Sequence, residues 1–154
     1  MTDLDGYQAV RESGAGIIDL SSRGRISVGG SEAVMFLNGL ITNDMKTLEP
    51  QRWMPAVFPN VQGRMIAAVR VIRLNDEENS PRFLLDTEAA THASVLKTIE
   101  RFTMAGDFRV VDKTGDTLCF SVQGNRHSPR LRQYFQPAIC QKTEWLKLHG
   151  MQRL

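Results

Sequence analysis

The stretch NVQGRMIAAVRVIRL, residues 60–74, decides the fold class, because it joins a tight turn to a long apolar strand. The turn is supplied by Asn60, Gln62 and Gly63. The strand runs from Met65 to Leu74, and the charged residues of the whole stretch are Arg64, Arg70 and Arg73. Since the stretch holds no Asp or Glu, it is either an ordinary core strand or a ligand-facing strand that has lost an acid.

The preceding stretch RWMPAVFPN, residues 52–60, has the composition of a strand that pairs with residues 65–74 across this turn. Pro55 and Pro59 have no amide hydrogen to donate to a neighbouring strand. We therefore predict a β-hairpin whose first strand lies at a sheet edge or contains bulges.

The pattern of apolar residues elsewhere predicts helices and strands in a mixed order. A short helix is expected over residues 5–13, and strands are expected over Ile17–Leu20, Arg25–Val28 and residues 82–86. Ser31 is the predicted N-cap of a second helix, because its hydroxyl can accept an amide hydrogen of the first turn. The apolar stripe of that helix is Ala33, Phe36, Leu37 and Leu40.

The clearest helix is predicted over residues 87–102, where one face carries His92, Val95, Leu96, Ile99 and Phe102. A second hairpin is predicted over residues 108–124 with its turn at residues 113–115, and one or two helical turns over residues 128–137. Hairpins mixed with crossing helices predict an α+β fold, with a largely antiparallel sheet and helices packed on it.

Length and composition indicate one globular domain. The chain has 154 residues, 42% of them hydrophobic and 23% charged, and no apolar run approaches the length of a membrane helix. The N-terminus, MTDLDGYQAVRESG, is polar and acidic, so we expect a cytoplasmic protein with no membrane partner. Neither cysteine belongs to a CxxC motif and the histidines are scattered, so we expect no metal site and a buried thiol at Cys119.

Charge is unevenly distributed along the chain. Residues 126–154 hold six Lys or Arg and a single acid, Glu144. A basic segment can bind nucleic acid, but no pattern of stacking aromatic residues accompanies this one. We favour a solvated terminal segment, or one separated from its packing partner, and do not expect nucleic acid as a partner.

An ordered set of motifs is more informative than any single one. It comprises DLSSRGRISVGG at residues 19–30, SEAVMFLNGLITND at 31–44, PNVQGRMIAAVRVIRL at 59–74, FLLDTEAATHASVLKTIERF at 83–102 and TLCFSVQGNRHSPRL at 117–131. From about Gly16 to Leu131 the set resembles the N-terminal part of the glycine-cleavage T-protein (aminomethyltransferase)/YgfZ superfamily. The resemblance implies a folate-binding fold with tetrahydrofolate, or a derivative of it, as the ligand.

The resemblance also implies a division of the chain. Members of the superfamily are typically much longer, so residues 1–131 correspond to an incomplete N-terminal domain, and residues 132–154 to a basic segment at a truncation point. Apolar surface that normally meets the further domains would then favour a protein partner or self-association.

Three departures separate this chain from the aminomethyltransferases it resembles. Their hairpin reads Gly-Gly-x-x-Asp-Asp, and the second Asp lies against the folate; here Ala67 and Ala68 take those two positions, and alanine has no proton to exchange. Pro55 stands where their pattern has a tyrosine, and Arg23 stands where they carry the methionine of a His-Met-Gly sequence. Because Arg23 is similar to some YgfZ-type sequences, the resemblance is closer to the YgfZ-like branch, which keeps the fold without transfer chemistry.

We predict four folate-binding residues, and no catalytic or metal-binding residue: Arg23, Pro55, Ala68 and Arg70. The guanidinium of Arg23 either forks onto a carboxylate of the folate or is a solvated turn residue. Arg70 must reach solvent, an acid such as Asp86, or the ligand, because an unpaired buried guanidinium is costly.

The expected function is tetrahydrofolate binding without enzymatic activity, linked through the YgfZ-like branch to the maintenance of iron–sulfur proteins. Two alternatives stay open. One is a glycine-cleavage aminomethyltransferase with a rearranged site, in which Asp44 or Asp86 replaces the lost acid. The other is a non-enzymatic interaction module.

Overall fold

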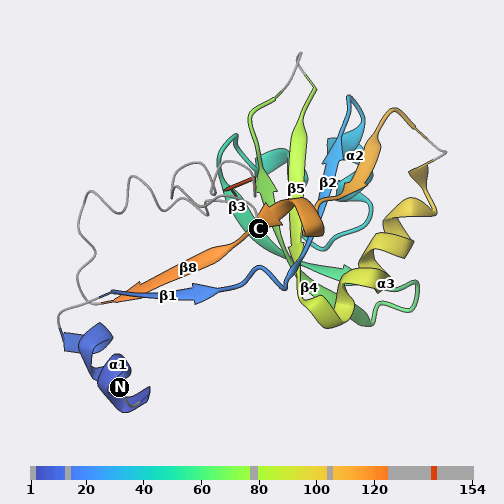
Figure 1. Ribbon diagram of the computed structural model, residues 1–154. Coiled ribbons are helices and arrows are strands. Elements are labelled where there is room, and N and C mark those ends of the chain that lie inside the picture. The colour runs from blue at the N-terminus through green and yellow to red at the C-terminus, as the bar shows by residue number, and fades with distance from the viewer. Residues whose placement is uncertain (1–2, 13–14, 77–79, 104–105, 125–139, 142–154) are drawn as a thin grey trace. The chain divides into compact units, whose positions relative to one another are not determined.

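The computed structural model describes residues 3–12, 15–76, 80–103, 106–124 and 140–141 (Figure 1). The chain divides into two compact units, which we describe separately. The sheet unit comprises residues 23–115, and the second unit comprises the residues before and after it. The helical turns predicted over residues 128–137 lie outside the described residues, and the proposed boundary at residue 131 stays a prediction.

The sheet unit is built on a five-stranded antiparallel sheet with the strand order β3-β4-β5-β2-β6. Its strands are β2 (Gly24–Gly29), β3 (Trp53–Pro59), β4 (Met65–Arg73), β5 (Arg82–Thr87) and β6 (Arg109–Asp112). The helices of this unit are α2 (Ala33–Asn38), the short 3₁₀ helix η1 (Met45–Thr47) and α3 (Ala89–Glu100). The predicted α+β class with a largely antiparallel sheet is confirmed.

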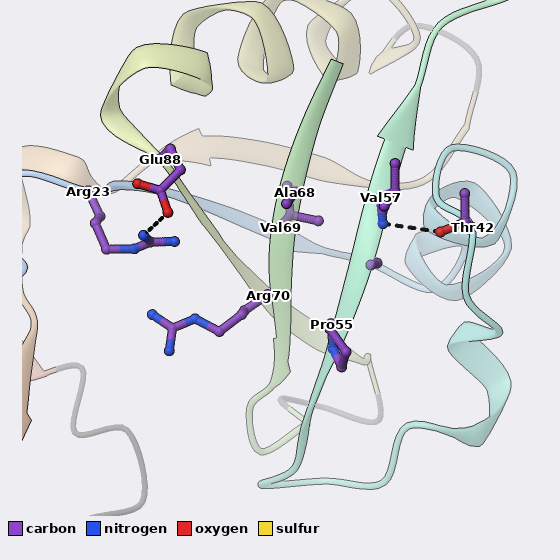
Figure 2. Close-up of a pocket in the computed structure, with 9 residues that line it drawn as sticks. Arg23, Thr42, Pro55, Val57, Ala68, Val69, Arg70 and Glu88 are labelled. Atoms are coloured by element: carbon purple, nitrogen blue, oxygen red, sulfur yellow. Dashed lines mark hydrogen bonds and ion pairs between the residues drawn. The ribbon is translucent and has the colours of Figure 1, made fainter. Parts of the chain in front are cut away.

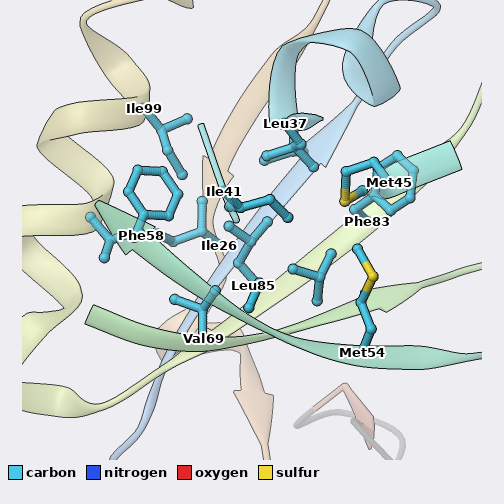
Figure 3. Close-up of a cluster of buried hydrophobic side chains, with 14 of the residues drawn as sticks. Ile26, Leu37, Ile41, Met45, Met54, Phe58, Val69, Phe83, Leu85 and Ile99 are labelled. Atoms are coloured by element: carbon cyan, nitrogen blue, oxygen red, sulfur yellow. The ribbon is translucent and has the colours of Figure 1, made fainter. Parts of the chain in front are cut away.

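One face of the sheet packs against the helices and forms the hydrophobic core (Figure 3). Side chains alternate between the two faces of a strand, and the residues of β3 and β4 that point into this core are Met54, Ala56, Phe58, Ala67, Val69 and Val71. Leu37 of α2, Met45 of η1 and Ile99 of α3 meet them from the helical side. The intervening residues of β3 and β4 therefore lie on the opposite face.

The hairpin predicted from residues 60–74 is confirmed, and β3 is an edge strand as its prolines require. The side chain of Asn60 accepts hydrogen bonds from the backbone amides of Gln62 and Arg64, both at 2.9 Å. Gly63 adopts a left-handed conformation (φ 75°), which glycine tolerates without steric cost. The pairing register shifts between Phe58 and Pro59, so the strand also contains an irregularity.

Two local predictions about helices are wrong. The N-cap of α2 is Glu32 rather than Ser31, because the Ser31 hydroxyl donates to the carboxylate of Asp107 at 2.6 Å instead of capping the helix. On α3, Val95 and Ile99 are buried as predicted, whereas Phe102 lies beyond the last helical residue and is 47% exposed. In both cases a contact or a helix end outside the local pattern decided the outcome.

The second predicted hairpin is also wrong. The edge of β2 pairs with β6, so residues 109–112 complete the five-stranded sheet, and the backbone amide of Lys113 donates to the carbonyl of Arg25 at 2.8 Å. Residues 114–116 then form a 3₁₀ helix, η3, and the chain continues into other strands. Pairing with the distant strand β2 therefore replaced the hairpin that the turn at residues 113–115 predicted.

The second unit contains helix α1 (Asp3–Glu12) and two small antiparallel pairs. Strand β1 (Ala15–Asp19) pairs with β8 (Phe120–Gly124), and β7 (Thr117–Leu118) pairs with β9 (Cys140–Gln141). Cys119 is buried, as predicted.

Candidate functional site

A pocket of about 670 Å³ lies on the sheet unit, on the face of β3 and β4 that is turned away from the helices (Figure 2). We call it the Ala68 pocket; it is lined by Arg23, Thr42, Pro55, Ala56, Val57, Ala68, Val69, Arg70 and Glu88. Pro55 pairs with Arg70, and Val57 pairs with Ala68, in the β3–β4 register. The floor of the pocket is therefore apolar where Val57 and Ala68 pair, and it carries the cationic side chain of Arg70 at the other pair.

The outer edge of the pocket is closed by the segment that follows α2. The backbone amide of Thr42 donates to the carbonyl of Val57 at 3.0 Å, and the Thr42 hydroxyl accepts from the amide of Val57 at 3.1 Å. The side-chain amide of Asn43 donates to the carbonyl of Pro55 at 3.0 Å. These bonds satisfy backbone groups that an edge strand otherwise leaves open, so β3 is held in place beside the pocket.

The cationic end of the pocket is organised by a buried carboxylate. Asp86 on β5 has a side chain only 3% exposed, and it accepts hydrogen bonds from Arg23 Nε at Oδ1 and from Arg70 Nε at Oδ2, both at 2.8 Å. Arg23 also pairs with Glu88, the N-cap residue of α3. Because Asp86 uses one oxygen for each guanidinium, it fixes both arginines relative to each other.

The protonation of Arg23 follows from these partners. Burial alone would lower the pKa of its guanidinium, but hydrogen bonds to Asp86 and Glu88 outweigh that effect and leave the pKa raised. Arg23 is therefore a permanent cation at the pocket wall.

The four residues predicted to bind folate all line this one pocket: Arg23, Pro55, Ala68 and Arg70. Ala67 precedes Ala68 and stands where the aminomethyltransferases carry the first of their two Asp residues. It points into the core and is 2% exposed. Of the alternatives for the arginines, the structure shows Arg70 paired with Asp86, and Arg23 as a paired wall residue rather than a solvated one. The folate-binding role of the four residues stays a prediction.

Five lining residues were not predicted from the sequence: Thr42, Ala56, Val57, Val69 and Glu88. Thr42 belongs to the LITND sequence at residues 40–44 and could have been found from that motif. Glu88 reads as an ordinary acid before a helix, so nothing in its local sequence indicated a contact with Arg23. Conversely, Asp44 is not a lining residue: its carboxylate accepts the backbone amide of Lys46 at 2.9 Å and caps η1.

A second polar cluster joins α3 to the end of β6. His92 Nε2 lies 3.0 Å from the carboxylate of Asp112, and His92 Nδ1 lies 3.3 Å from the hydroxyl of Thr87. Burial would raise the pKa of Asp112, but hydrogen bonds from Thr114 and His92 lower it to about 2. Through these contacts His92 connects α3 to the ends of β5 and β6. Among the described residues, no group of three or more His, Cys, Asp or Glu could hold a metal ion.

The lining of the Ala68 pocket holds few ionisable groups: Arg23, Arg70 and Glu88. Within the described lining, the single carboxylate belongs to Glu88, which is already paired with Arg23. At Ala68 itself only a methyl group faces the pocket, so no acid or base stands there. None of the described helices is long and apolar enough to cross a membrane.

Comparison with known proteins agrees with this architecture. The chain is 34% identical over 102 residues to the mitochondrial iron–sulfur cluster assembly factor IBA57 homolog of Mycosarcoma maydis, covering 61% of this chain and 25% of that protein. It is 26% identical over 141 residues to the aminomethyltransferase of Thermus thermophilus, covering 92% of this chain and 39% of that protein. The chain thus spans about a quarter to two fifths of these relatives.

A solved structure has the same fold. The glycine cleavage system aminomethyltransferase T from Bartonella henselae matches with a TM-score of 0.69 at 20% identity, over 97% of this chain and 36% of that one. A family model described as the GCVT N-terminal domain matches residues 4–152, which extends past both ends of the motif set at Gly16 and Leu131. The chain belongs to the GCVT N-terminal domain family.

Proposed function

We propose that this chain binds a reduced folate in the Ala68 pocket and does not transfer a one-carbon unit. The observation that carries the proposal is the position of Ala68. It lines a pocket of about 670 Å³ at the place where the resembling aminomethyltransferases carry the acid that lies against the folate. The space for a ligand is present, and the group that would act on it is not.

The chemistry of the walls supports an elongated, anionic ligand. The floor formed by Pro55, Val57 and Ala68 suits a flat ring system. Arg70 is 39% exposed even while it is paired with Asp86, so its guanidinium can still donate to a carboxylate such as those of a folate glutamate tail.

Transfer chemistry would need a substitute acid, and the two candidates are poorly suited. Asp86 is held by two guanidiniums, and Asp44 caps η1 outside the pocket lining. Each carboxylate already has partners that a transfer role would have to displace. We therefore favour the YgfZ-like branch, with a role in iron–sulfur protein maintenance that the similarity to an iron–sulfur cluster assembly factor supports.

The location of the protein is a separate proposal. The cytoplasm is our expectation, whereas the assembly-factor relative carries the word mitochondrial in its name. Imaging of the tagged protein beside a mitochondrial marker distinguishes the two locations.

Thermal unfolding with a stable reduced folate, 5-formyltetrahydrofolate, tests the binding proposal. The ligand should raise the melting temperature of the wild type, and the increase should be lost in Arg70→Gln. Arg64→Gln removes the same charge from the exposed β3–β4 turn and should keep the increase. If neither this chain nor a version extended at its C-terminus is stabilised by the ligand, the binding proposal is wrong.

The leading alternative is aminomethyl transfer, which the similarity to the Thermus thermophilus aminomethyltransferase over 92% of this chain favours. It predicts measurable turnover with the glycine-cleavage carrier protein, and a large loss of that turnover in Asp86→Asn or Asp44→Asn. Turnover that neither substitution changes would remove the rearranged-site mechanism.

A non-enzymatic interaction module is favoured by exposed apolar side chains. Trp53 and Met65 of the sheet unit, and Ile17 and Ile18 of the second unit, are all exposed. Self-association through such surfaces would raise the apparent mass in light scattering as the protein concentration increases. A constant monomer mass would exclude self-association.

A further inference from the structure

A second pocket, of about 740 Å³, lies on the same unit at the β5–β2–β6 side of the sheet. We call it the Gly29 pocket; it is lined by Ser27, Gly29, Gly30, Ser80, Arg82, Gly106, Asp107, Phe108, Arg109, Val111 and Lys113. It shares no lining residue with the Ala68 pocket. None of the motifs that support folate binding explains its composition.

The pairing register places two arginines on either side of a glycine. Gly29 on β2 pairs directly with Arg82 on β5 and with Arg109 on β6. Directly paired residues of antiparallel strands point to the same face, with Cα atoms about 5 Å apart. Both guanidiniums therefore rise from one face of the sheet, across a position that has no side chain of its own.

The glycine leaves the volume of one side chain unfilled next to the stem of Arg82. A Cβ atom added at Gly29 would lie 3.4 Å from Arg82 Cγ and 3.7 Å from the carbonyl oxygen of Pro81. The backbone at Gly29 does not require glycine, since its φ is not in the left-handed region, whereas Gly30 has a φ of 132°. Neither backbone strain nor a prohibitive contact therefore requires glycine at this position.

The charge of the lining is predominantly positive. Arg82, Arg109 and Lys113 face one acid, Asp107, whose carboxylate accepts a hydrogen bond from the Ser31 hydroxyl at 2.6 Å. Lys113 follows Arg109 by four residues, so the two side chains share a face of β6 and its extension. Arg82 and Lys113 have further contacts of their own, and Arg109 is the exposed cation of the three.

We propose that the Gly29 pocket binds the phosphate group of a small molecule. Two arginines paired across one glycine, with a lysine in the same lining, match the several oxygens of a phosphate, and hydroxyls of Ser27 and Ser80 can donate to the same group. Because Gly29 has no side chain, an anion can approach the sheet backbone beside Arg82 more closely than another residue would allow. The proposal does not depend on folate binding.

Isothermal titration calorimetry of the full chain with inorganic pyrophosphate tests this proposal. The wild type should bind, and Arg109→Gln should weaken binding about tenfold or more, because a charge-assisted hydrogen bond is lost. Gly29→Ala should weaken binding severalfold by raising the floor, with the melting temperature nearly unchanged. Arg64→Gln removes one positive charge far from the pocket lining and should bind like the wild type.

Further titrations identify the chemical class. Adenosine diphosphate that binds as tightly as pyrophosphate would assign the site to phosphate alone, and tighter binding of the nucleotide would assign it to a nucleoside phosphate; both outcomes support the proposal. It is overturned if the wild type does not bind either probe, if citrate binds as tightly as pyrophosphate, or if Arg64→Gln weakens binding as much as Arg109→Gln. Folate binding is measured separately, so either proposal can fail alone.

Discussion

The two pockets of the sheet unit use arginine in opposite ways. In the Ala68 pocket, Arg23 and Arg70 are held by the buried carboxylate of Asp86, and Glu88 adds a second anion. In the Gly29 pocket, Arg82 and Arg109 flank a glycine, and the acid of the lining is already engaged by Ser31. The first arrangement fixes the arginines before a ligand arrives, whereas the lining of the second holds three cations, Arg82, Arg109 and Lys113, and one acid, Asp107.

Because of this difference, we expect substitutions in the two pockets to affect different properties, the stability of the fold in one and anion binding in the other. Residues that organise the Ala68 pocket should affect folding, because the buried carboxylate of Asp86 on β5 connects Arg23, just before β2, with Arg70 on β4. Residues of the Gly29 pocket should affect anion binding with little change in folding. The substitutions below test that separation, beginning with the largest expected effect.

The adjacent alanines of β4 should respond very differently to the same substitution. Ala67→Asp places a carboxylate in the core and should destabilise the fold by about 3 kcal/mol or more, because Ala67 is 2% exposed. Ala68→Asp places it in the open pocket and should cost less than about 1 kcal/mol. Urea denaturation of both variants measures the contrast. Equal losses would mean that Ala68 does not face a pocket.

The carboxylate of Asp86 is the next test. Asp86→Asn leaves Arg23 and Arg70 without their shared anion, and we expect a loss of about 2 kcal/mol, less than for a fully buried pair because both guanidiniums are partly exposed. Asp76→Asn breaks the Arg73–Asp76 pair near the surface and is the matched control, with an expected loss of about 0–1 kcal/mol. Chemical denaturation that gives similar losses for the two variants would refute the organising role of Asp86.

Much of this fold could be predicted from the sequence where local signals act alone. The prolines of β3 and the turn at Asn60 and Gly63 carry their geometry with them, so the first hairpin followed directly. The second hairpin failed because β6 pairs with β2, whose residues lie about eighty positions earlier in the chain. Non-local pairing of this kind leaves no trace in a short window of sequence.

The candidate site likewise has a part that the sequence motifs predicted and a part that depends on non-local strand pairing. The motif positions predicted that Arg23, Pro55, Ala68 and Arg70 belong together, and all four line one pocket. The contact between Arg23 and Glu88 depends on the β2–β5 pairing and on the start of α3, which no motif specifies. The Gly29 pocket is likewise a product of register, since three strands bring its arginines to one glycine.

Acid should weaken the fold through Asp112. Its pKa is lowered from 3.8 to about 2 in the folded protein, so its contribution is fully present above pH 3.8 and is lost as the pH falls toward 2. Because the side chain is 42% exposed, we expect about 1 kcal/mol after allowance for solvent screening. Denaturation at several pH values should show this decrease in wild type and a smaller one in Asp112→Asn. Identical pH dependence in both would contradict the assignment.

The smallest stability effect should come from Glu88. It is 61% exposed, so its ion pair with Arg23 contributes about 0–1 kcal/mol to folding. Glu88→Gln should nevertheless increase the affinity for 5-formyltetrahydrofolate, because an anion that competes for Arg23 is removed. Fluorescence titration of the variant beside the wild type checks this. Weaker binding by Glu88→Gln would mean that Glu88 contacts the ligand instead of competing with it.

The most direct test of a folate receptacle without transfer chemistry is calorimetric titration of 5-formyltetrahydrofolate into wild type and Ala68→Leu. The larger side chain fills the pocket between β3 and β4 while leaving the core face untouched. We predict saturable one-to-one binding by the wild type, loss of that binding in Ala68→Leu, and similar melting temperatures for both proteins. Equal binding by the two proteins would place the folate somewhere other than the Ala68 pocket and contradict the account.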